Sequence, residues 1–257
     1  MGSVPLVGGL DVGSRSIELV LHDGDRVVDQ RKTATTFDPL RQARALLAGV
    51  RLDRLVATGY GRGLVENAGL CAAVETITEI KAYGLGAAAL CPEARTVLDV
   101  GGQDTKAIAL AAGGKILKFE MNDRCAAGTG KFLEHLATVF QIPLAEFGAY
   151  ALEGKEQLTI NSMCTVFAET EAVSLMARGR DPHDIALGLH ASIVKRTTAM
   201  LARVGLASPV LFAGGVANNP CVVRLLAAAL GTPLCIPEQP EMVGAHGAAV
   251  HGCRTGV

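Results

Sequence analysis

One short motif occurs twice in this chain, and the repetition constrains the fold more than any other feature. The pentapeptide LDVGS at residues 10–14 recurs as LDVGG at residues 98–102, so position 10 corresponds to position 98. Each copy is followed by two apolar strands, which are joined by Asp23-Gly24 in the first half and by Gly113-Gly114 in the second. Both dipeptides are typical of tight hairpin turns. Two such meanders predict a duplicated α/β fold with two lobes and a cleft between them.

Helical periodicity fills the segments between and after the two meanders. It predicts six helices, over Pro39–Ala48, Glu75–Leu90, Gly130–Phe140, Val166–Arg178, Pro182–Val204 and Pro220–Leu230. We expect residues 1–95 to form the N-terminal lobe and residues 96–257 the C-terminal lobe. A tightly packed C-terminal helix that contains His246 can fold back onto the first lobe.

Charge and hydropathy exclude several classes of protein. Charged residues make up 19% of the chain and the net charge is −1, so a basic surface for nucleic acid is not expected. The most apolar stretch, Ala82 to Leu90, is much shorter than the ~20 residues that span a bilayer, and the N-terminus does not have the pattern of a signal peptide. We therefore expect a soluble, cytoplasmic protein without a membrane or nucleic-acid partner.

A third glycine-rich turn follows an apolar strand near the C-terminus. Residues 210–213 (VLFA) lead into Gly214 and Gly215, then into Val216 and Asn218 before the next helix. A strand, a Gly-Gly pair and a helix start allow a backbone to approach a nucleotide closely. This turn therefore joins the two copies of the repeat as a candidate nucleotide-binding segment.

Asp11 and Asp99 end corresponding strands, so a duplicated fold places them across the cleft from each other. Two converging carboxylates can hold a hydrated Mg²⁺ that bridges nucleotide phosphates. Taken alone, each Asp is better explained as a turn-forming residue before glycine, but the duplication favours the metal site. Gln103 is a candidate for orienting an attacking water, as glutamines do in other nucleotide hydrolases. Backbone N–H groups, hydroxyls and cations near these residues can bind phosphate, and the candidates are Gly13, Ser14, Arg15, Ser16, Gly101, Gly102, Asp104, Thr105 and Lys106.

Two of the seven cysteines differ from the rest. In a chain without a signal peptide, all seven are expected to be reduced thiols. Five lie in apolar or small-residue surroundings and are expected to be buried and inert: Cys71, Cys91, Cys221, Cys235 and Cys253. Cys125 and Cys164 instead each follow polar residues and open a predicted helix. Two cysteines per chain become four in a symmetric dimer, which is the ligand set of a [4Fe–4S] cluster.

The three turns resemble, in order, the two phosphate motifs and the adenosine motif of the acetate/sugar kinase–Hsp70–actin superfamily. More closely, the chain resembles the activator ATPases of 2-hydroxyacyl-CoA dehydratases and the related ATPase subunits of benzoyl-CoA reductases. The resemblance covers nearly the whole chain. The resemblance is strongest in four segments, which are ATGYGR at 57–62, GGQD at 101–104, MNDRCAAGTG at 121–130 and CTVFAE at 164–169.

The resemblance implies a ribonuclease-H-like, actin-like ATPase fold that binds ATP or ADP together with Mg²⁺. It also implies a homodimer with one [4Fe–4S] cluster, held by Cys125 and Cys164 of both subunits. With ATP hydrolysis, a low-potential electron would pass from ferredoxin or flavodoxin through this cluster to a partner that carries iron–sulfur clusters of its own. Gly128, Thr129 and Gly130, which begin the helix after Cys125, are expected to lie close to the nucleotide cleft.

One position departs from this family. Its members often carry a lysine shortly after the first Gly-Ser, whereas this chain has Glu18 there, and Arg15 can take over the positive charge. The partner therefore stays open between a 2-hydroxyacyl-CoA dehydratase, a benzoyl-CoA reductase and a double-cubane-cluster reductase. Two rival functions also remain. One is a small-molecule kinase of the same fold, which would tolerate loss of both cysteines, and the other is a non-catalytic nucleotide-binding regulator.

Overall fold

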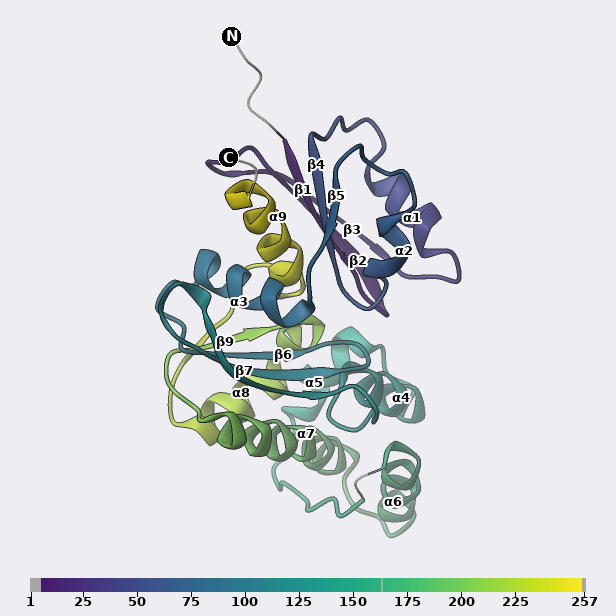
Figure 1. Ribbon diagram of the computed structural model, residues 1–257. Coiled ribbons are helices and arrows are strands. Elements are labelled where there is room, and N and C mark those ends of the chain that lie inside the picture. Colours follow the sequence, from purple (N-terminus) through teal and green to yellow (C-terminus); the bar gives the residue numbers. More distant parts are fainter. Residues whose placement is uncertain (1–5, 163, 256–257) are drawn as a thin grey trace.

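The computed structural model describes residues 6–162 and 164–255, which form two lobes, each built on a five-stranded sheet (Figure 1). The strands of the first sheet are β1 (Val7–Val12), β2 (Ser16–His22), β3 (Val27–Ala34), β4 (Arg54–Thr58) and β5 (Val74–Thr76). Those of the second are β6 (Thr96–Val100), β7 (Thr105–Leu110), β8 (Ile116–Asn122), β9 (Val210–Ala213) and β10 (Leu234–Cys235).

The two sheets have the same topology. Their strand orders are β3-β2-β1-β4-β5 and β8-β7-β6-β9-β10, with an antiparallel meander on one side and parallel strands on the other. The register also corresponds, because Asp11 lies opposite Glu18 and Asp99 lies opposite Lys106. The predicted duplication of an α/β unit is thus confirmed.

The helices are α1 (Pro39–Leu46), α2 (Arg62–Glu66), α3 (Glu79–Leu90), α4 (Gly130–Phe140), α5 (Leu144–Ala151), α6 (Thr165–Ala177), α7 (Pro182–Val204), α8 (Pro220–Leu230) and α9 (Val243–Thr255). All six predicted helices are present, one of them with a corrected start, and α2 and α5 were not predicted. Short 3₁₀ turns occur at η1 (Ala112–Gly114), η2 (Gly215–Asn218) and η3 (Pro240–Met242). The helix predicted from Glu75 begins at Glu79, because residues 74–76 join the first sheet and the Thr78 hydroxyl caps the helix by accepting from the Lys81 N–H.

The fold is layered, with two helices between the sheets (Figure 1). One face of the first sheet packs on α1 and α2, and its other face packs on α9. The second sheet packs on α3 with one face, and its other face is covered by the helical layer that includes α4, α5, α7 and α8. The C-terminal helix α9 lies on the N-terminal sheet, α3 lies on the C-terminal sheet, and the two helices pack on each other. The division of the chain at residue 95 remains a prediction.

Glycines allow α3 and α9 to approach closely. A Cβ at Gly86 of α3 would lie 2.1 Å from the Val243 carbonyl oxygen, and one at Gly247 of α9 would lie 1.7 Å from that of Ala82. The glycines of both helices therefore serve helix packing.

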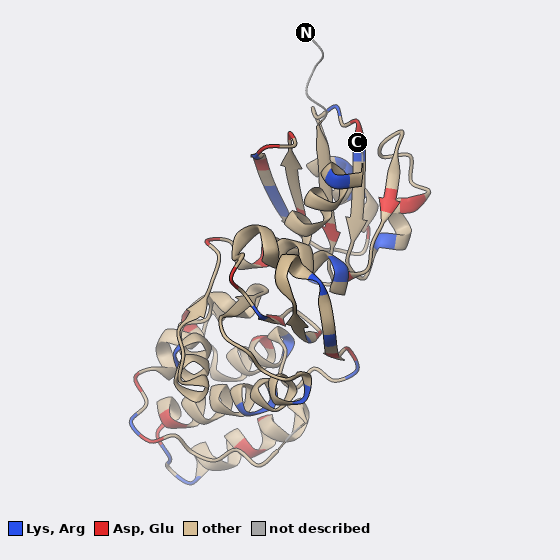
Figure 2. Cartoon of the chain, turned by 60° about the vertical axis from the view of Figure 1, so that its left-hand side comes forward, with Lys and Arg blue, Asp and Glu red and all other residues tan. Residues whose placement is uncertain are grey.

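Acidic and basic residues are interspersed along the chain in both lobes (Figure 2). Within the described residues, no helix combines the length and apolar character that crossing a bilayer requires.

Candidate functional site

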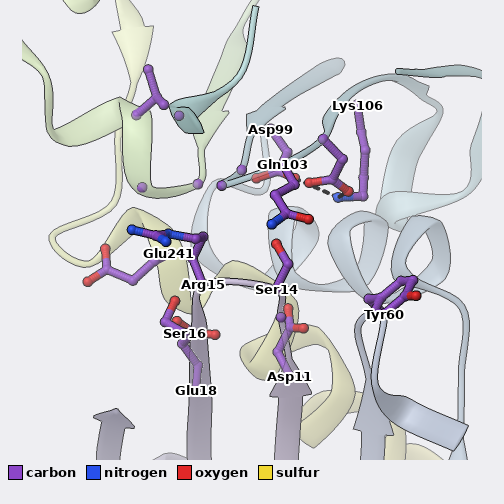
Figure 3. Close-up of a pocket in the computed structure, with 18 of the residues that line it drawn as sticks. Asp11, Ser14, Arg15, Ser16, Glu18, Tyr60, Asp99, Gln103, Lys106 and Glu241 are labelled. Carbon is purple, nitrogen blue, oxygen red and sulfur yellow. Dashed lines mark hydrogen bonds and ion pairs between the residues drawn. The ribbon is translucent and has the colours of Figure 1, made fainter. Parts of the chain in front are cut away.

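A cleft of about 740 Å³ opens between the lobes, where the three glycine turns meet (Figure 3). The turn between β1 and β2 faces the turn between β6 and β7, and both are closed by equivalent hydrogen bonds: Gly13 N–H to Ser16 O and Gly101 N–H to Asp104 O, each 3.0 Å. The turn after β9 completes the wall. Most of the predicted residues line this cleft: Asp11, Gly13, Ser14, Arg15, Ser16, Asp99, Gly101, Gly102, Gln103, Asp104, Lys106, Gly130, Gly214, Gly215, Val216 and Asn218.

Gly128 and Thr129 lie beside the cleft and shape the start of α4. The Gly128 carbonyl accepts a hydrogen bond from the Thr105 hydroxyl at 2.8 Å, and the Thr129 hydroxyl donates to Ala126 O at 2.6 Å. The first N–H groups of α4 donate to the second turn, from Gly130 to Gly101 O and from Lys131 to Gly102 O. Gly128 and Thr129 therefore help to fix α4 against the turn, and neither lines the cleft.

A glycine packs closely against each buried aspartate, at equivalent places in the two halves. Gly59, after β4, and Gly214, after β9, have φ of 89° and 82°. A Cβ at Gly59 would lie 2.4 Å from Asp11 Oδ1, and a Cβ at Gly214 would lie 2.5 Å from Asp99 Oδ1. Gly244, at the start of α9, approaches Asp11 from the other side. The third turn thus has a counterpart in the first half, at Gly59.

Lys106 does not present a free positive charge to the cleft. Its ammonium lies 2.9 Å from Asp99 Oδ2, 2.5 Å from Asp104 Oδ2 and 2.9 Å from Glu79 Oε2, and the side chain is buried. Burial lowers the pKa of Lys106, but the three carboxylates outweigh it and hold that pKa well above its usual value. The role predicted for Lys106 as a phosphate ligand needs this correction, because the carboxylates already neutralise it.

Arg15 also meets a carboxylate. Its guanidinium reaches from the first turn to Glu134 of α4, with Nη2 2.5 Å from Oε1, and about half of the Arg15 side chain is exposed. This ion pair joins the N-terminal lobe to α4 at the mouth of the cleft. Arg15 would have to leave Glu134, or share it, to contact a phosphate.

The buried acids of the cleft have raised pKa values. Burial raises the pKa of Asp11 well above its usual range, and the charge of Glu18 raises it further. Burial likewise raises the pKa of Glu18 to about 7, against a lowering hydrogen bond from Ser16, and raises that of Asp99 despite Lys106. Asp99 Oδ1 and Glu18 Oε1 are buried and have no hydrogen-bond partner in the described part of the chain. A buried carboxylate oxygen without a hydrogen-bond partner is suited to bind a cation.

Several lining residues were not assigned to a site from the sequence. They come from elements that only the tertiary fold brings to the cleft, and they include Tyr60, Glu79, Tyr83, Met121, Asp123, Leu133, Glu134, Leu144, Ala145, Asn219 and Glu241. The similarity of Gly59-Tyr60-Gly61 to the Gly-Gly turn after β9 was a usable signal for Tyr60. The carboxylates had no comparable signal in the sequence.

Cys125 and Cys164 are both exposed, and Cys221 is buried as predicted. The prediction of burial needs a correction for Cys71, Cys91, Cys235 and Cys253, which are only partly buried. Cys164 is the N-cap residue of α6, as predicted. For Cys125 the prediction of a helix start is wrong, because α4 begins five residues later and Cys125 lies in the loop after β8. The Asn122 side-chain amide holds this loop by donating to the carbonyl oxygens of Cys125 and Ala127 at 2.8 and 3.3 Å.

The surroundings of Cys164 are organised by polar and apolar groups. Glu171 of α6 accepts from the backbone N–H groups of Asn161 and Ser162 and so holds the segment before Cys164. The same helix exposes the apolar side chains Val166, Phe167 and Val173. Among the described residues, no three His, Cys, Asp or Glu side chains gather closely enough to hold a metal ion.

The duplicated topology, the two lobes and the glycine turns around buried aspartates define an actin-like ATPase fold. Solved structures agree with this class. A ROK-family glucokinase from Streptomyces griseus in complex with glucose and AMPPNP aligns over 95% of this chain and 98% of its own, with a TM-score of 0.60 at 13% identity, and shows the fold alone.

Within this class, residues 9–252 match the BadF/BadG/BcrA/BcrD ATPase family, and the chain belongs to that family. The activator of lactoyl-CoA dehydratase from Anaerotignum propionicum is 38% identical over 95% of this chain and 95% of its own length. The 2-hydroxyisocaproyl-CoA dehydratase activator from Clostridium difficile, solved with bound ADPNP, is 34% identical over 97% of this chain and 94% of its own, with a TM-score of 0.88. The (R)-2-hydroxyglutaryl-CoA dehydratase component A from Acidaminococcus fermentans has a TM-score of 0.90 at 33% identity, over 97% of this chain and 98% of its own.

Proposed function

We propose that this protein is an ATP-hydrolysing iron–sulfur activator that passes a low-potential electron to a partner 2-hydroxyacyl-CoA dehydratase or related reductase. One observation carries the proposal. The loop of Cys125 runs directly into α4, and the first residue of α4, Gly130, lines the cleft. The candidate nucleotide site and an exposed thiol thus lie at the two ends of one short segment, residues 125–130.

The cleft suits a nucleoside triphosphate with Mg²⁺. The turns at Gly13 and Gly101 offer backbone N–H groups to phosphate oxygens. Asp11 and Asp99 would hold Mg²⁺, most simply through its waters, and Gln103 would orient the attacking water. At the third turn the cleft wall is apolar, formed by Leu133, Leu144, Ala145 and Val216, and such side chains suit the faces of an adenine ring.

The exposed cysteines suit a cluster shared by two chains. Two Cys thiolates from each subunit complete the four ligands of a [4Fe–4S] cluster, which supplies one-electron transfer at low potential. The apolar side chains that α6 exposes beside Cys164, Val166 and Phe167 above all, support a contact with a second copy of the chain. The homodimer therefore accounts for both the thiols and the exposed apolar face.

The electron acceptor is proposed from the relatives. Three of them are named as activators of dehydratases that act on 2-hydroxyacyl-CoA esters. A further relative, one of the subunits of the benzoyl-CoA reductase from Thauera aromatica, is 28% identical over 86% of this chain and 82% of its own. A dehydratase is thus the first candidate and a reductase, including one with a double-cubane cluster, the second. Ferredoxin or flavodoxin would supply the electron.

Iron analysis of anaerobically purified protein tests the proposal. We expect about four irons per dimer, as a [4Fe–4S] cluster requires, and loss of this iron in Cys125→Ser and in Cys164→Ser. The matched controls Cys71→Ser and Cys253→Ser should keep it, because these thiols are partly buried and lie in the first lobe's packing. A small-molecule kinase of this fold would instead contain no iron. Full iron content in Cys125→Ser would rule out the bridging cluster.

A further inference from the structure

The two halves of the cleft differ at one pair of equivalent positions. Position 18 corresponds to position 106, by the same offset that relates Asp11 to Asp99. In the second half, Asp99 lies directly opposite Lys106 on the neighbouring strand, and the two form an ion pair. In the first half, Asp11 lies directly opposite Glu18. One half therefore pairs opposite charges, and the other places two carboxylates together.

The carboxylate of Glu18 lacks the cation that its counterpart supplies. The residue is 4% exposed, and its Oε1 is buried without a hydrogen-bond partner in the described residues. Lys32 lies directly opposite it on β3, but the Lys32 ammonium bonds to Glu241. Like charges directly opposite on adjacent strands are destabilising, and burial increases the cost. Figure 3 shows Asp11 and Glu18 on neighbouring strands at the edge of the cleft.

The charge of the whole cleft makes the imbalance larger. Among the described residues that line it, eight are carboxylic acids, namely Asp11, Glu18, Glu79, Asp99, Asp104, Asp123, Glu134 and Glu241, and two are cations, Arg15 and Lys106. Both cations are already paired with carboxylates of the cleft wall. A nucleoside triphosphate adds further negative charge, and neither Asp11 nor Glu18 forms an ion pair with a cation of the described residues.

We propose that the N-terminal wall of the cleft holds a second divalent cation, between the carboxylates of Asp11 and Glu18 and the phosphates of the bound nucleotide. This inference rests on the proposed function, since the phosphates complete the site. Mg²⁺ commonly uses one or two carboxylates together with phosphate oxygens and water. The second cation would do for Asp11 what the Lys106 ammonium does for Asp99, and Glu18 would be the residue that distinguishes the two halves.

Counting bound Mn²⁺ tests this site without using activity. Mn²⁺ is titrated into the anaerobically purified holoprotein saturated with AMPPNP, and electron paramagnetic resonance reports the free ion. The wild-type protein should bind two Mn²⁺ per protomer with the nucleotide, whereas Glu18→Gln should bind one. Glu18→Lys, which reproduces the Asp99–Lys106 pair of the second half, should also bind one and still bind AMPPNP.

Asp123→Asn is the matched control. It removes an exposed carboxylate that lines the same cleft but follows β8 in the C-terminal lobe, so it should keep two Mn²⁺. A wild-type count of one Mn²⁺ with AMPPNP bound, or an unchanged count in both Glu18 variants, overturns the second site and leaves the proposed function standing. Failure of the wild-type protein to bind AMPPNP, measured separately by calorimetry, overturns both.

Discussion

At the scale of single residues, the burial and the hydrogen bonding of Asp99 support its proposed role in binding Mg²⁺. Its side chain is fully buried, Oδ2 accepts from Lys106, and Oδ1 is without a partner among the described residues. Asp99→Asn keeps the shape of the group and removes its charge. We expect Mg²⁺-dependent ATP hydrolysis to fall about 100-fold or more, the loss typical of removing one electrostatic catalytic group. Phosphate release measures the rate, and iron content should not change, because Cys125 and Cys164 lie outside the cleft.

Asp29→Asn is a suitable control for this change. It removes a carboxylate from the outer strand β3, where Asp29 pairs with Arg31 away from the cleft. Its rate of hydrolysis should equal that of the wild-type protein. Metal-independent hydrolysis at the wild-type rate in Asp99→Asn would contradict the role of converging carboxylates.

Much of the cleft was predictable residue by residue, because the repeat placed Asp11 and Asp99 at equivalent strand ends. The sequence did not show that Glu79 and Asp104 would neutralise Lys106, or that Glu134 would pair with Arg15. These partners come from α3 and α4 or from a neighbouring turn, and only tertiary packing determines where such side chains meet. Local patterns therefore predicted the backbone of the site better than its charge balance.

At the scale of elements, the contact between α3 and α9 depends on glycine. Gly247→Ala would place a methyl group against the Ala82 carbonyl and force the two helices apart. We expect a loss of about 1–3 kcal/mol in the free energy of unfolding, as for other overpacked interiors, measured by denaturant titration. Because each helix lies on the sheet of a different lobe, weaker nucleotide binding should accompany the loss.

Gly63→Ala provides the comparison for this variant. Gly63 lies in α2, and a Cβ there would meet no atom within 4 Å. Alanine favours a helix over glycine by roughly 0.5–1 kcal/mol, so this variant should be as stable as the wild-type protein or slightly more so. Equal stability of Gly247→Ala would show that the helix contact can relax without cost.

The limits of sequence prediction at this scale have physical causes. Residues 75–78 continue the helical pattern before α3. In the structure, however, residues 74–76 pair with β4 as strand β5, and the Thr78 cap makes the helix begin at Glu79. Residues 125–127 (Cys-Ala-Ala) have small side chains that are compatible with a helix. Gly128, with φ of 86°, and the hydrogen bonds of Asn122 hold this segment in a loop conformation instead of a helix. Strand pairing at the first place, and local side-chain hydrogen bonds at both, thus override a weak helical preference.

At the scale of the whole molecule, α4 joins the cleft to the helix that carries Cys164. Glu134 of α4 binds Arg15 of the N-terminal lobe, and the next residue, His135, contacts Glu169 of α6 at 2.6 Å. The buried Ala168 packs α6 into the core of the C-terminal lobe. A nucleotide that draws Arg15 toward its phosphates would therefore act on α4, and through it on α6. Such coupling requires that the nucleotide bind two arrangements of the lobes with different affinity.

If the nucleotide changes the arrangement of the lobes, it should also change access to a cluster held between two copies of the chain. Couplings between sites are typically ~1–3 kcal/mol, about 5–150-fold in affinity or accessibility. We expect an iron chelator such as bathophenanthroline to remove iron from the reduced protein several-fold faster with Mg-ATP than without nucleotide, followed by absorbance of the iron complex. The ADP state serves as the control for occupancy alone. Equal rates in the nucleotide-free, ADP and ATP states, in protein shown to bind ATP, would mean that α4 does not transmit the state of the cleft to the cysteines.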